Sequence, residues 1–214
     1  MKIMGFTYHH GRKQILLKGD SALLVNRKPF FVPDCTSRVV GYPALALRVC
    51  RLGKNIDARF ASRYYDAIAL ALDIQADDLR ALASSEGLPW TTAVSLDGSF
   101  PVGEFREVEG LREVQKGEEG LREVQKGEEG LREVEKGTER LRGVYSIGEA
   151  SLTYEATAEQ MAEVVSLVSK YMTIRQGDII YLPLTEEPIP LKIDDTIVAG
   201  FEGEEEQNLF CRIK

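Results

Sequence analysis

Cysteine is scarce in this chain. Its 214 residues contain three cysteines, and none of them form the Cys-x-x-Cys spacing of a zinc or redox motif. An odd number without that spacing predicts neither a disulfide framework nor a zinc site. Cys50 and Cys211 lie in apolar, strand-like runs. Because free cysteine behaves as a small hydrophobic residue, we expect both to be buried thiols.

The chain also lacks a basic run and a long apolar run. Its formal net charge is -7, which disfavours nucleic acid and anionic membrane surfaces as partners. No stretch approaches the roughly 18 apolar residues of a membrane span, and the first eight residues contain too short an apolar run for a signal peptide. We therefore expect no nucleic-acid partner, no membrane partner and a cytoplasmic location.

The composition is otherwise that of a globular protein, with 43% hydrophobic and 29% charged residues. A chain of this length buries a substantial core and fits one domain with at most a small appendage. We assign residues 1–27 to an N-terminal arm and residues 28–214 to one domain. An insertion at about 104–142 interrupts that domain.

The insertion is built from tandem decapeptides. EGLREVQKGE occurs twice and is followed by EGLREVEKGT, together spanning Glu109 to Thr138. A ten-residue period drifts by roughly 80° per copy on an α-helix, so no continuous apolar face results. Each interior glycine would cost a helix about 1 kcal/mol. These features favour a solvated, weakly structured insertion, and they leave open a short solenoid or a partner-binding element.

Hydrophobic periodicity predicts the regular elements. Spacings of three and four indicate an amphipathic helix over residues 58–72 with Asp57 as its cap, and a second helical piece over residues 73–86. Thr157 and Gln160 form a capping-box pattern before a helix over residues 158–171. Strands are expected at residues 44–49, 173–184, 191–199 and 209–213.

Four short stretches together resemble the fumarylacetoacetate hydrolase family: KPFFVPD (28–34), RLGKNI (51–56), DGSFPVG (97–103) and GDIIY (177–181). The resemblance implies an α+β fold that is mainly β, with layered mixed sheets and a few amphipathic helices. It also implies a homodimer. Members of the family hold a catalytic divalent cation, such as Mg²⁺ or Mn²⁺, with a Glu-x-Glu pair and a later Asp.

The metal ligands that the resemblance implies are mostly missing. Counting back from Arg51 places the two glutamates at Tyr42 and Ala44, and no acidic residue occurs from Cys35 to Ile56. Asp73 matches the third ligand. A lone carboxylate does not repay the dehydration of a small divalent ion, so we expect no metal cofactor. Asp73 is then expected to act as a helix N-cap or turn residue.

Other positions depart from the family pattern as well. The family arginine and glutamine near the third ligand correspond to Asp77 and Arg80, while Asp78 matches the pattern. The family lysine before Asp-Gly-Ser corresponds to Val94, and the Thr-Gly-Thr-Pro loop reads Leu-Pro-Leu-Thr, with Leu184 as its third residue. We expect Tyr42, Ala44, Val94 and Leu184 to be remnants of the former substrate pocket. Tyr42, Val94 and Leu184 are expected to plug it.

An N-terminal histidine of the family works with a glutamate. His9 and His10 occupy a similar place, but no glutamate follows them before Glu86, so we expect an exposed or aromatic-packed role for both. No catalytic residue is assigned.

Three hypotheses about function remain open. The first is a family scaffold without metal-dependent catalysis that acts in binding or assembly. The second is a metal-dependent hydrolase, decarboxylase or tautomerase of small 2-oxo or 1,3-dicarbonyl acids. The third is an interaction protein that works through its repeats. A protein can inherit a fold without the activity of its family, so the residues of the site have to decide among the three hypotheses.

Overall fold

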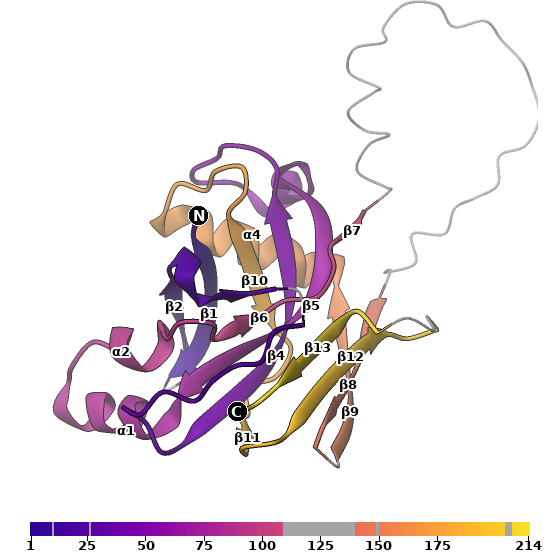
Figure 1. Cartoon of the computed structure of the whole chain (residues 1–214). Coiled ribbons are helices and arrows are strands. Elements are labelled where there is room, and N and C mark those ends of the chain that lie inside the picture. Colours follow the sequence, from indigo (N-terminus) through magenta and orange to yellow (C-terminus); the bar gives the residue numbers. More distant parts are fainter. Residues whose placement is uncertain (10, 26, 109–139, 149, 204–206) are drawn as a thin grey trace, which may run out of the picture.

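The computed structural model describes residues 1–9, 11–25, 27–108, 140–148, 150–203 and 207–214 (Figure 1). The decapeptides lie outside the described residues, as do His10 and Glu204 to Glu206. Two layered sheets with helices around them make up the described part, as the resemblance predicts.

The larger sheet has the strand order β2-β1-β10-β4-β5-β7, and β11 pairs with β4 beyond the end of β10. Its parallel pair is β1 with β10, which joins the two ends of the chain. The strands are β1 (Ile3–His9), β2 (Arg12–Lys18), β4 (Val39–Val49), β5 (Tyr65–Ala76), β7 (Arg106–Glu107), β10 (Ile179–Pro183) and β11 (Ile189–Leu191). The β1–β2 hairpin comes from residues 1–27, which the sequence analysis assigns to an arm.

The smaller sheet has the order β13-β12-β8-β9 and lies to the lower right in Figure 1. Its strands are β8 (Arg140–Ile147), β9 (Ala150–Thr157), β12 (Thr196–Phe201) and β13 (Leu209–Arg212). A third pair joins β3 (Leu23–Leu24) to β6 (Phe100–Pro101). The buried hydroxyl of Tyr145 on β8 lies 2.8 Å from the carbonyl oxygen of Ala44 and 3.1 Å from that of Ala71, which ties the smaller sheet to the centre of the larger one.

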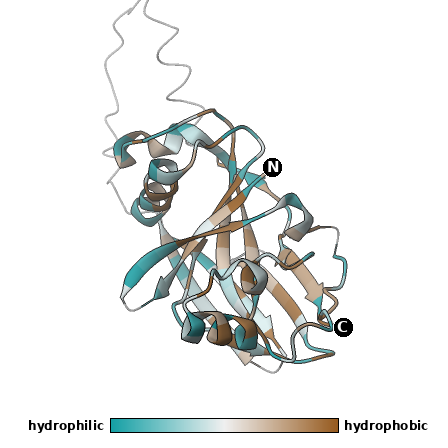
Figure 2. Ribbon diagram, turned by 90° about the vertical axis from the view of Figure 1, so that its left-hand side faces the viewer, coloured by the Kyte–Doolittle hydropathy of each residue, from teal (hydrophilic) through white to brown (hydrophobic). Residues whose placement is uncertain are grey.

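Helices cover the edges and one end of the sheets. The α4 helix (Ala158–Tyr171) begins with the predicted capping box, in which Thr157 and Gln160 each accept from the other's backbone amide. Its apolar face, which includes Val164, Val165 and Val168, is buried in the main core. Two shorter helices, α1 (Asp77–Glu86) and α2 (Thr91–Val94), pack against each other; α2 also contacts β2 and β5, and α1 contacts β4 and β5. In Figure 2 the central strands carry long hydrophobic stretches, whereas the helices alternate between hydrophobic and hydrophilic residues.

The helix predicted over residues 58–72 is wrong beyond Tyr64. A 3-10 helix, η2 (Ala58–Tyr64), occupies its first half and is capped by Asp57, whose Oδ1 accepts from the Arg59 amide at 3.1 Å. The second half is β5, where almost every side chain is buried. A central strand that is buried on both faces shows no alternation, so its apolar run also matches a helical spacing.

The helix predicted over residues 73–86 begins four residues later than expected. Residues 73–76 belong to β5, and α1 begins at Asp77, so the prediction that Asp73 is a helix N-cap or turn residue is wrong. The strand predicted over residues 173–184 is confirmed in its second half as β10, and the one at 209–213 as β13. Among the described residues, no helix is long and apolar enough to cross a membrane.

Candidate functional site

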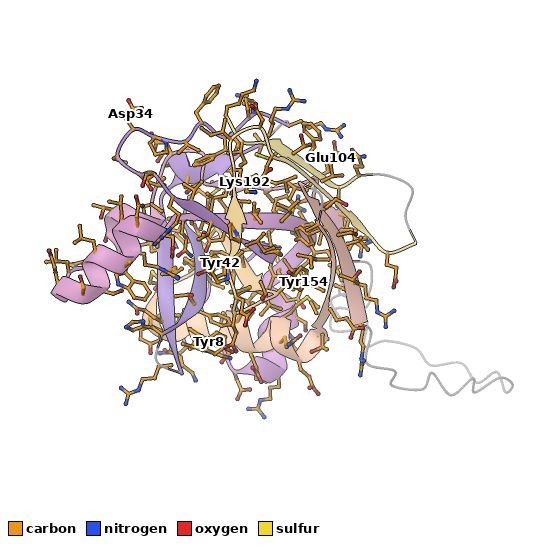
Figure 3. All side chains as sticks on the ribbon, turned by 90° about the horizontal axis from the view of Figure 1, so that it is seen from below. Tyr8, Asp34, Tyr42, Glu104, Tyr154 and Lys192 are labelled. Carbon is orange, nitrogen blue, oxygen red and sulfur yellow. The ribbon has the colours of Figure 1, made fainter. Side chains whose placement is uncertain are left out.

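The three positions that the resemblance assigns to the family's metal ligands lie on adjacent strands. Tyr42 on β4 pairs with Asp73 on β5, and Ala44 pairs with Ala71 two residues further along. Residues two apart on a strand share a face, so Tyr42, Ala44 and Asp73 lie on one side of the sheet. All three are buried, and Figure 3 places Tyr42 near the middle of the molecule. Asp73 is the one carboxylate among them.

A buried lysine meets that carboxylate. Lys18, the last residue of β2, is 0% exposed, and its Nζ lies 2.7 Å from Asp73 Oδ1. This contact is an ion pair between the ammonium and the carboxylate. The ammonium donates hydrogen bonds to the carbonyl oxygen of Ile74 at 2.8 Å, to Ser99 Oγ at 2.9 Å and to the Ser99 carbonyl at 3.3 Å.

The surroundings of Lys18 identify its protonation state. Ser99 Oγ donates its own proton to the Leu96 carbonyl at 2.6 Å, so it accepts from Lys18. Every oxygen around Nζ is therefore an acceptor, and only the ammonium form carries three N–H donors. Burial lowers the pKa of Lys18 below its ordinary value, while the charge of Asp73 opposes that shift.

The second oxygen of Asp73 is also satisfied. Its Oδ2 accepts from Gln75 Nε2 at 2.7 Å and from the hydroxyl of Tyr181 at 3.0 Å. Burial, together with the nearby charge of Asp73, raises the pKa of Tyr181 well above its ordinary value, so the phenol keeps the proton that it donates. Asp73 is thus surrounded by donors that belong to the chain itself.

Aromatic rings fill the adjacent space. Phe100 and Tyr181 lie 5.0 Å apart between ring centroids and pack with Ala44, Ala71 and other small residues of β4 and β5. A Cβ atom on Gly5 would come within 2.4 Å of the Tyr181 ring, so this glycine allows the ring to lie against β1. The hollow above Asp73 has no room for a water molecule.

An open groove lies beside this buried centre. It has a volume of about 280 Å³ between the β1–β2 hairpin, α4 and the loop after β10. Its exposed lining is more polar than apolar, and Asp73 and Lys18 do not line it. The residues that line it are Phe6, Tyr8, Lys13, Gln160, Glu163, Val164, Leu182, Pro183, Leu184, Thr185 and Glu186.

The structure does not gather all the predicted pocket remnants. Val94, on α2, is buried in a separate cluster with Leu16 and Trp90. Leu184 is half-buried at the edge of the main core and lines the open groove. His9 packs edge-on against Trp90 with ring centroids 4.7 Å apart, which confirms the aromatic-packed role predicted for it.

Arg80 and Asp77, which replace family residues, lie beside the site rather than in it. Asp77 pairs with Arg38 at 2.8 Å. The guanidinium of Arg80 donates to Gln75 Oε1 at 3.3 Å and lies over the ring of Tyr42 at 5.6 Å. Through Gln75, Arg80 holds one of the donors to Asp73 in place.

Asp78 fastens the loop before β4 to the start of α1. Its carboxylate accepts from the Thr36 hydroxyl, from the Ser37 amide and hydroxyl and from the Leu79 amide. Partial burial raises the pKa of Asp78, but these hydrogen bonds outweigh it and lower the pKa to about 2. Asp78 therefore supports the turn that leads into α1.

We expect the Asp78 clamp to give the protein acid-sensitive stability. A carboxylate whose folded pKa is depressed contributes stability above its unfolded pKa of about 3.9, and loses it as the pH falls toward the folded value of about 2. In the Asp78→Asn variant, urea unfolding should show a smaller loss of stability between about pH 4 and pH 2 than in the wild-type protein. Identical pH profiles for the two proteins would contradict this role.

Comparison with known proteins places the chain in a family. Residues 6–203 match the family model described as "Fumarylacetoacetate (FAA) hydrolase C-terminal". The chain belongs to the fumarylacetoacetate hydrolase family. The bovine mitochondrial oxaloacetate tautomerase FAHD1 is 28% identical over 88% of this chain and 76% of that protein. The Arabidopsis thaliana protein of the same name is 27% identical over 88% of this chain and 75% of its own.

Solved structures of family members share the fold. The Pseudomonas aeruginosa fumarylpyruvate hydrolase, solved with Mn²⁺ and pyruvate, superposes with a TM-score of 0.75 at 15% identity, covering 99% of this chain and 88% of its own. A fumarylacetoacetate hydrolase family protein from Yersinia pestis gives 0.75 at 19% identity, covering 100% of this chain and 92% of its own. At these identities the likeness establishes the fold.

The residues of this chain do not fit the family's divalent cation. A hard cation such as Mg²⁺ needs several oxygen ligands, preferably anionic, to replace its water. Of the three positions that the resemblance assigns to the metal ligands, two carry a phenol and a methyl group, and the carboxylate at the third is already paired with an ammonium. Within the ranges that the structure describes, no group of three or more His, Cys, Asp or Glu side chains could hold a metal ion.

Lys18 is the residue of this site that sequence reasoning missed. A lysine at the end of a strand, followed by Gly-Asp, is normally a solvent-exposed residue. Its partners Ile74 and Ser99 are 56 and 81 residues away in the chain, so no local spacing marks the contact. The sequence does contain one indirect signal, because an unmatched Asp73 in an apolar strand requires a cationic or donor partner.

Proposed function

We propose that this chain is a member of the fumarylacetoacetate hydrolase family that has lost metal-dependent catalysis and acts through binding or assembly. The observation that carries the proposal is the replacement of the ligand set. Tyr42 and Ala44 stand in the Glu positions, and Asp73 is neutralised by Lys18 at 2.7 Å. Without that ligand set, the part of the chain that the structure describes offers no other group of side chains to hold the Lewis acid that polarises a 2-oxo acid in such enzymes.

The competing candidate is an enzyme, and the relatives favour it. Proteins that are 27–28% identical to this chain are named oxaloacetate tautomerases, so the substrate class would be small 2-oxo or 1,3-dicarbonyl acids. The open groove beside the site is large enough for such a molecule. However, Asp73 and Lys18 do not line the groove, so a ligand there meets none of the family's remaining chemistry.

Turnover and metal binding together test the proposal. The conversion between the enol and keto forms of oxaloacetate and the cleavage of an acylpyruvate are followed by ultraviolet absorbance, with added Mn²⁺ or Mg²⁺. The bovine oxaloacetate tautomerase serves as a positive control for the first assay. We expect rates equal to those without protein, and no saturable 1:1 heat signal in calorimetry with either ion. Micromolar binding that disappears in Asp73→Ala would overturn the proposal.

Assembly as a homodimer is part of the same proposal and rests on the family resemblance. Sedimentation equilibrium of the full chain should give twice its mass of 23.9 kDa. The decapeptide repeats offer a different role as an interaction element, and removing residues 109–138 tests it by comparing the dimer mass and partner capture before and after. We also propose a cytoplasmic location, although the named oxaloacetate tautomerase relatives are mitochondrial.

A further inference from the structure

A basic surface lies at the end of the molecule where η2 meets the C-terminus of α4. Two segments that are far apart in the sequence form it, residues 50–64 and residues 168–178. Gly53 and Ile174 join the segments, because their backbones exchange hydrogen bonds of 3.0 and 2.9 Å. In Figure 1 both segments lie near the top of the described part.

The charge of this surface is opposite to that of the chain. The two segments contain six basic and two acidic residues, a net charge of +4, whereas the whole chain carries -7. Both acidic side chains are already engaged. Asp57 caps η2 and lies 3.5 Å from Arg59, and Asp178 is buried and pairs with Lys2 at 2.7 Å. A positive potential therefore covers one end of an acidic protein. The six basic residues are Arg51, Lys54, Arg59, Arg63, Lys170 and Arg175.

The fold accounts for some of these cations but not for all of them. Lys54 Nζ donates to the Lys170 carbonyl oxygen at 3.2 Å, which satisfies an orphan acceptor at the end of α4. Lys170 itself lies in the last turn of that helix, where the helix dipole favours a positive charge. Arg51 and Arg175 are exposed, and neither forms an ion pair with an acidic residue that the structure describes. Their charges are thus available to a partner.

Exposed apolar side chains lie among these charges. Leu52 follows Arg51 and is 66% exposed, and Phe60 on η2 is 40% exposed. The guanidinium carbons of Arg59 and Arg63 lie 4.7 and 5.1 Å from the centroid of the Phe60 ring. Arginine and aromatic side chains are enriched at protein interfaces. The surface therefore offers apolar anchors as well as positive charge.

We propose that this basic surface binds a short acidic segment of a partner protein, in which carboxylates alternate with apolar side chains. The inference deepens the binding role in the proposed function and rests on it. Carboxylates of the segment pair with Arg51 and Arg175, while its apolar side chains cover Leu52 and Phe60. A membrane or a nucleic acid fits less well, because an extended polyanion also meets the acidic remainder of the chain and is repelled by it.

Fluorescence anisotropy of the full chain with a labelled peptide tests this surface. The probe is a short fluorescein-labelled peptide of alternating glutamate and leucine, and we expect saturable binding at low salt that weakens as salt screens the charges. In Arg51→Glu/Arg175→Glu the affinity should fall roughly tenfold. Lys28→Glu/Arg212→Glu changes the net charge equally at two exposed residues elsewhere, and should keep most of the affinity.

A second peptide tests the apolar anchors. It replaces each leucine of the probe with serine at the same charge, and we expect the wild-type protein to bind it more weakly. Leu52→Ser should weaken binding of the glutamate–leucine peptide and leave the glutamate–serine peptide unchanged. Circular dichroism of each variant checks that the fold is kept.

Several outcomes count against the basic surface. Equal losses in the two charge-reversal variants would show that net charge alone governs binding. The absence of saturable binding to the wild-type protein would overturn the proposal, as would tighter binding to phosphatidylserine vesicles or to a single-stranded oligonucleotide than to the peptide. Metal binding or turnover of oxaloacetate would instead count against the proposed function and leave the peptide titration unchanged, so the two failures are distinguishable.

Discussion

Replacing Lys18 with methionine should be among the most damaging single changes to the described part of this protein. The substitution keeps the length of the side chain but leaves Asp73, which is 2% exposed, without its cation. Removing one member of a buried ion pair typically costs about 3–5 kcal/mol, because the remaining charge is uncompensated. Urea unfolding of Lys18→Met at neutral pH should therefore show a fall of that size in the free energy of unfolding.

Two further variants show whether the unpaired charge of Asp73 causes this loss of stability. The double variant Lys18→Met/Asp73→Asn has no uncompensated carboxylate. We therefore expect it to be about 1–3 kcal/mol more stable than the sum of the effects of Lys18→Met and Asp73→Asn predicts. Lys13→Met, on the same strand, removes a lysine whose side chain is 36% exposed and 3.6 Å from Glu163. That control should lose at most about 1 kcal/mol. A Lys18→Met protein as stable as the Lys13→Met control would show that the buried pair is dispensable.

Adding one methyl group to Gly5 should have the second large effect. A Cβ at this position would lie 2.4–2.5 Å from three carbon atoms of the Tyr181 ring, well inside van der Waals contact. To avoid the clash, the ring must move away from β1 and weaken its 3.0 Å hydrogen bond to Asp73. Overpacking of this kind typically costs about 1–3 kcal/mol, and the lost hydrogen bond adds to it. Denaturant unfolding of Gly5→Ala measures the sum.

A compensating change identifies the cause. Tyr181→Leu removes the ring atoms that meet the new methyl group, so Gly5→Ala should cost less in the Tyr181→Leu background than in the wild-type protein. Gly19→Ala is the matched control, because the nearest atom to its added Cβ is Ser21 Oγ at 4.0 Å. We expect that control to change stability by about 0.5 kcal/mol or less. An equal cost of Gly5→Ala in both backgrounds would rule out the contact with Tyr181 as its source.

Elements with a local signal were predictable from sequence. The capping box at Thr157 and Gln160 and the apolar face behind it led to α4, because both the start of a helix and its buried side are encoded within one turn or two. The short motifs that resemble the family led to the layered fold, and the family match over residues 6–203 confirms that membership. The cap at Asp57 was also predicted correctly, although the helix that follows it is a short 3-10 helix.

Elements defined by distant neighbours were not predictable in the same way. β5 became a strand because β4 and β7 flank it and both of its faces are covered, and its own residues fit a helical spacing equally well. The contacts of the site also join residues that are far apart in the sequence. The sequence motifs indicate which carboxylates are missing. The partner of Asp73 is Lys18 on β2, and only the folded sheet brings the two side chains together.

The parallel pairing of β1 with β10 has a consequence for how the chain folds as it is synthesised. The backbone amide of Lys2 bonds to Asp178, 176 residues later, so the first strand emerges from the ribosome long before its neighbour exists. At typical elongation rates this delay is roughly 9–35 s. During that time the β1–β2 hairpin exposes an unpaired edge. Nascent chains of this protein are therefore expected to need chaperone cover at their N-terminus until synthesis passes residue 183.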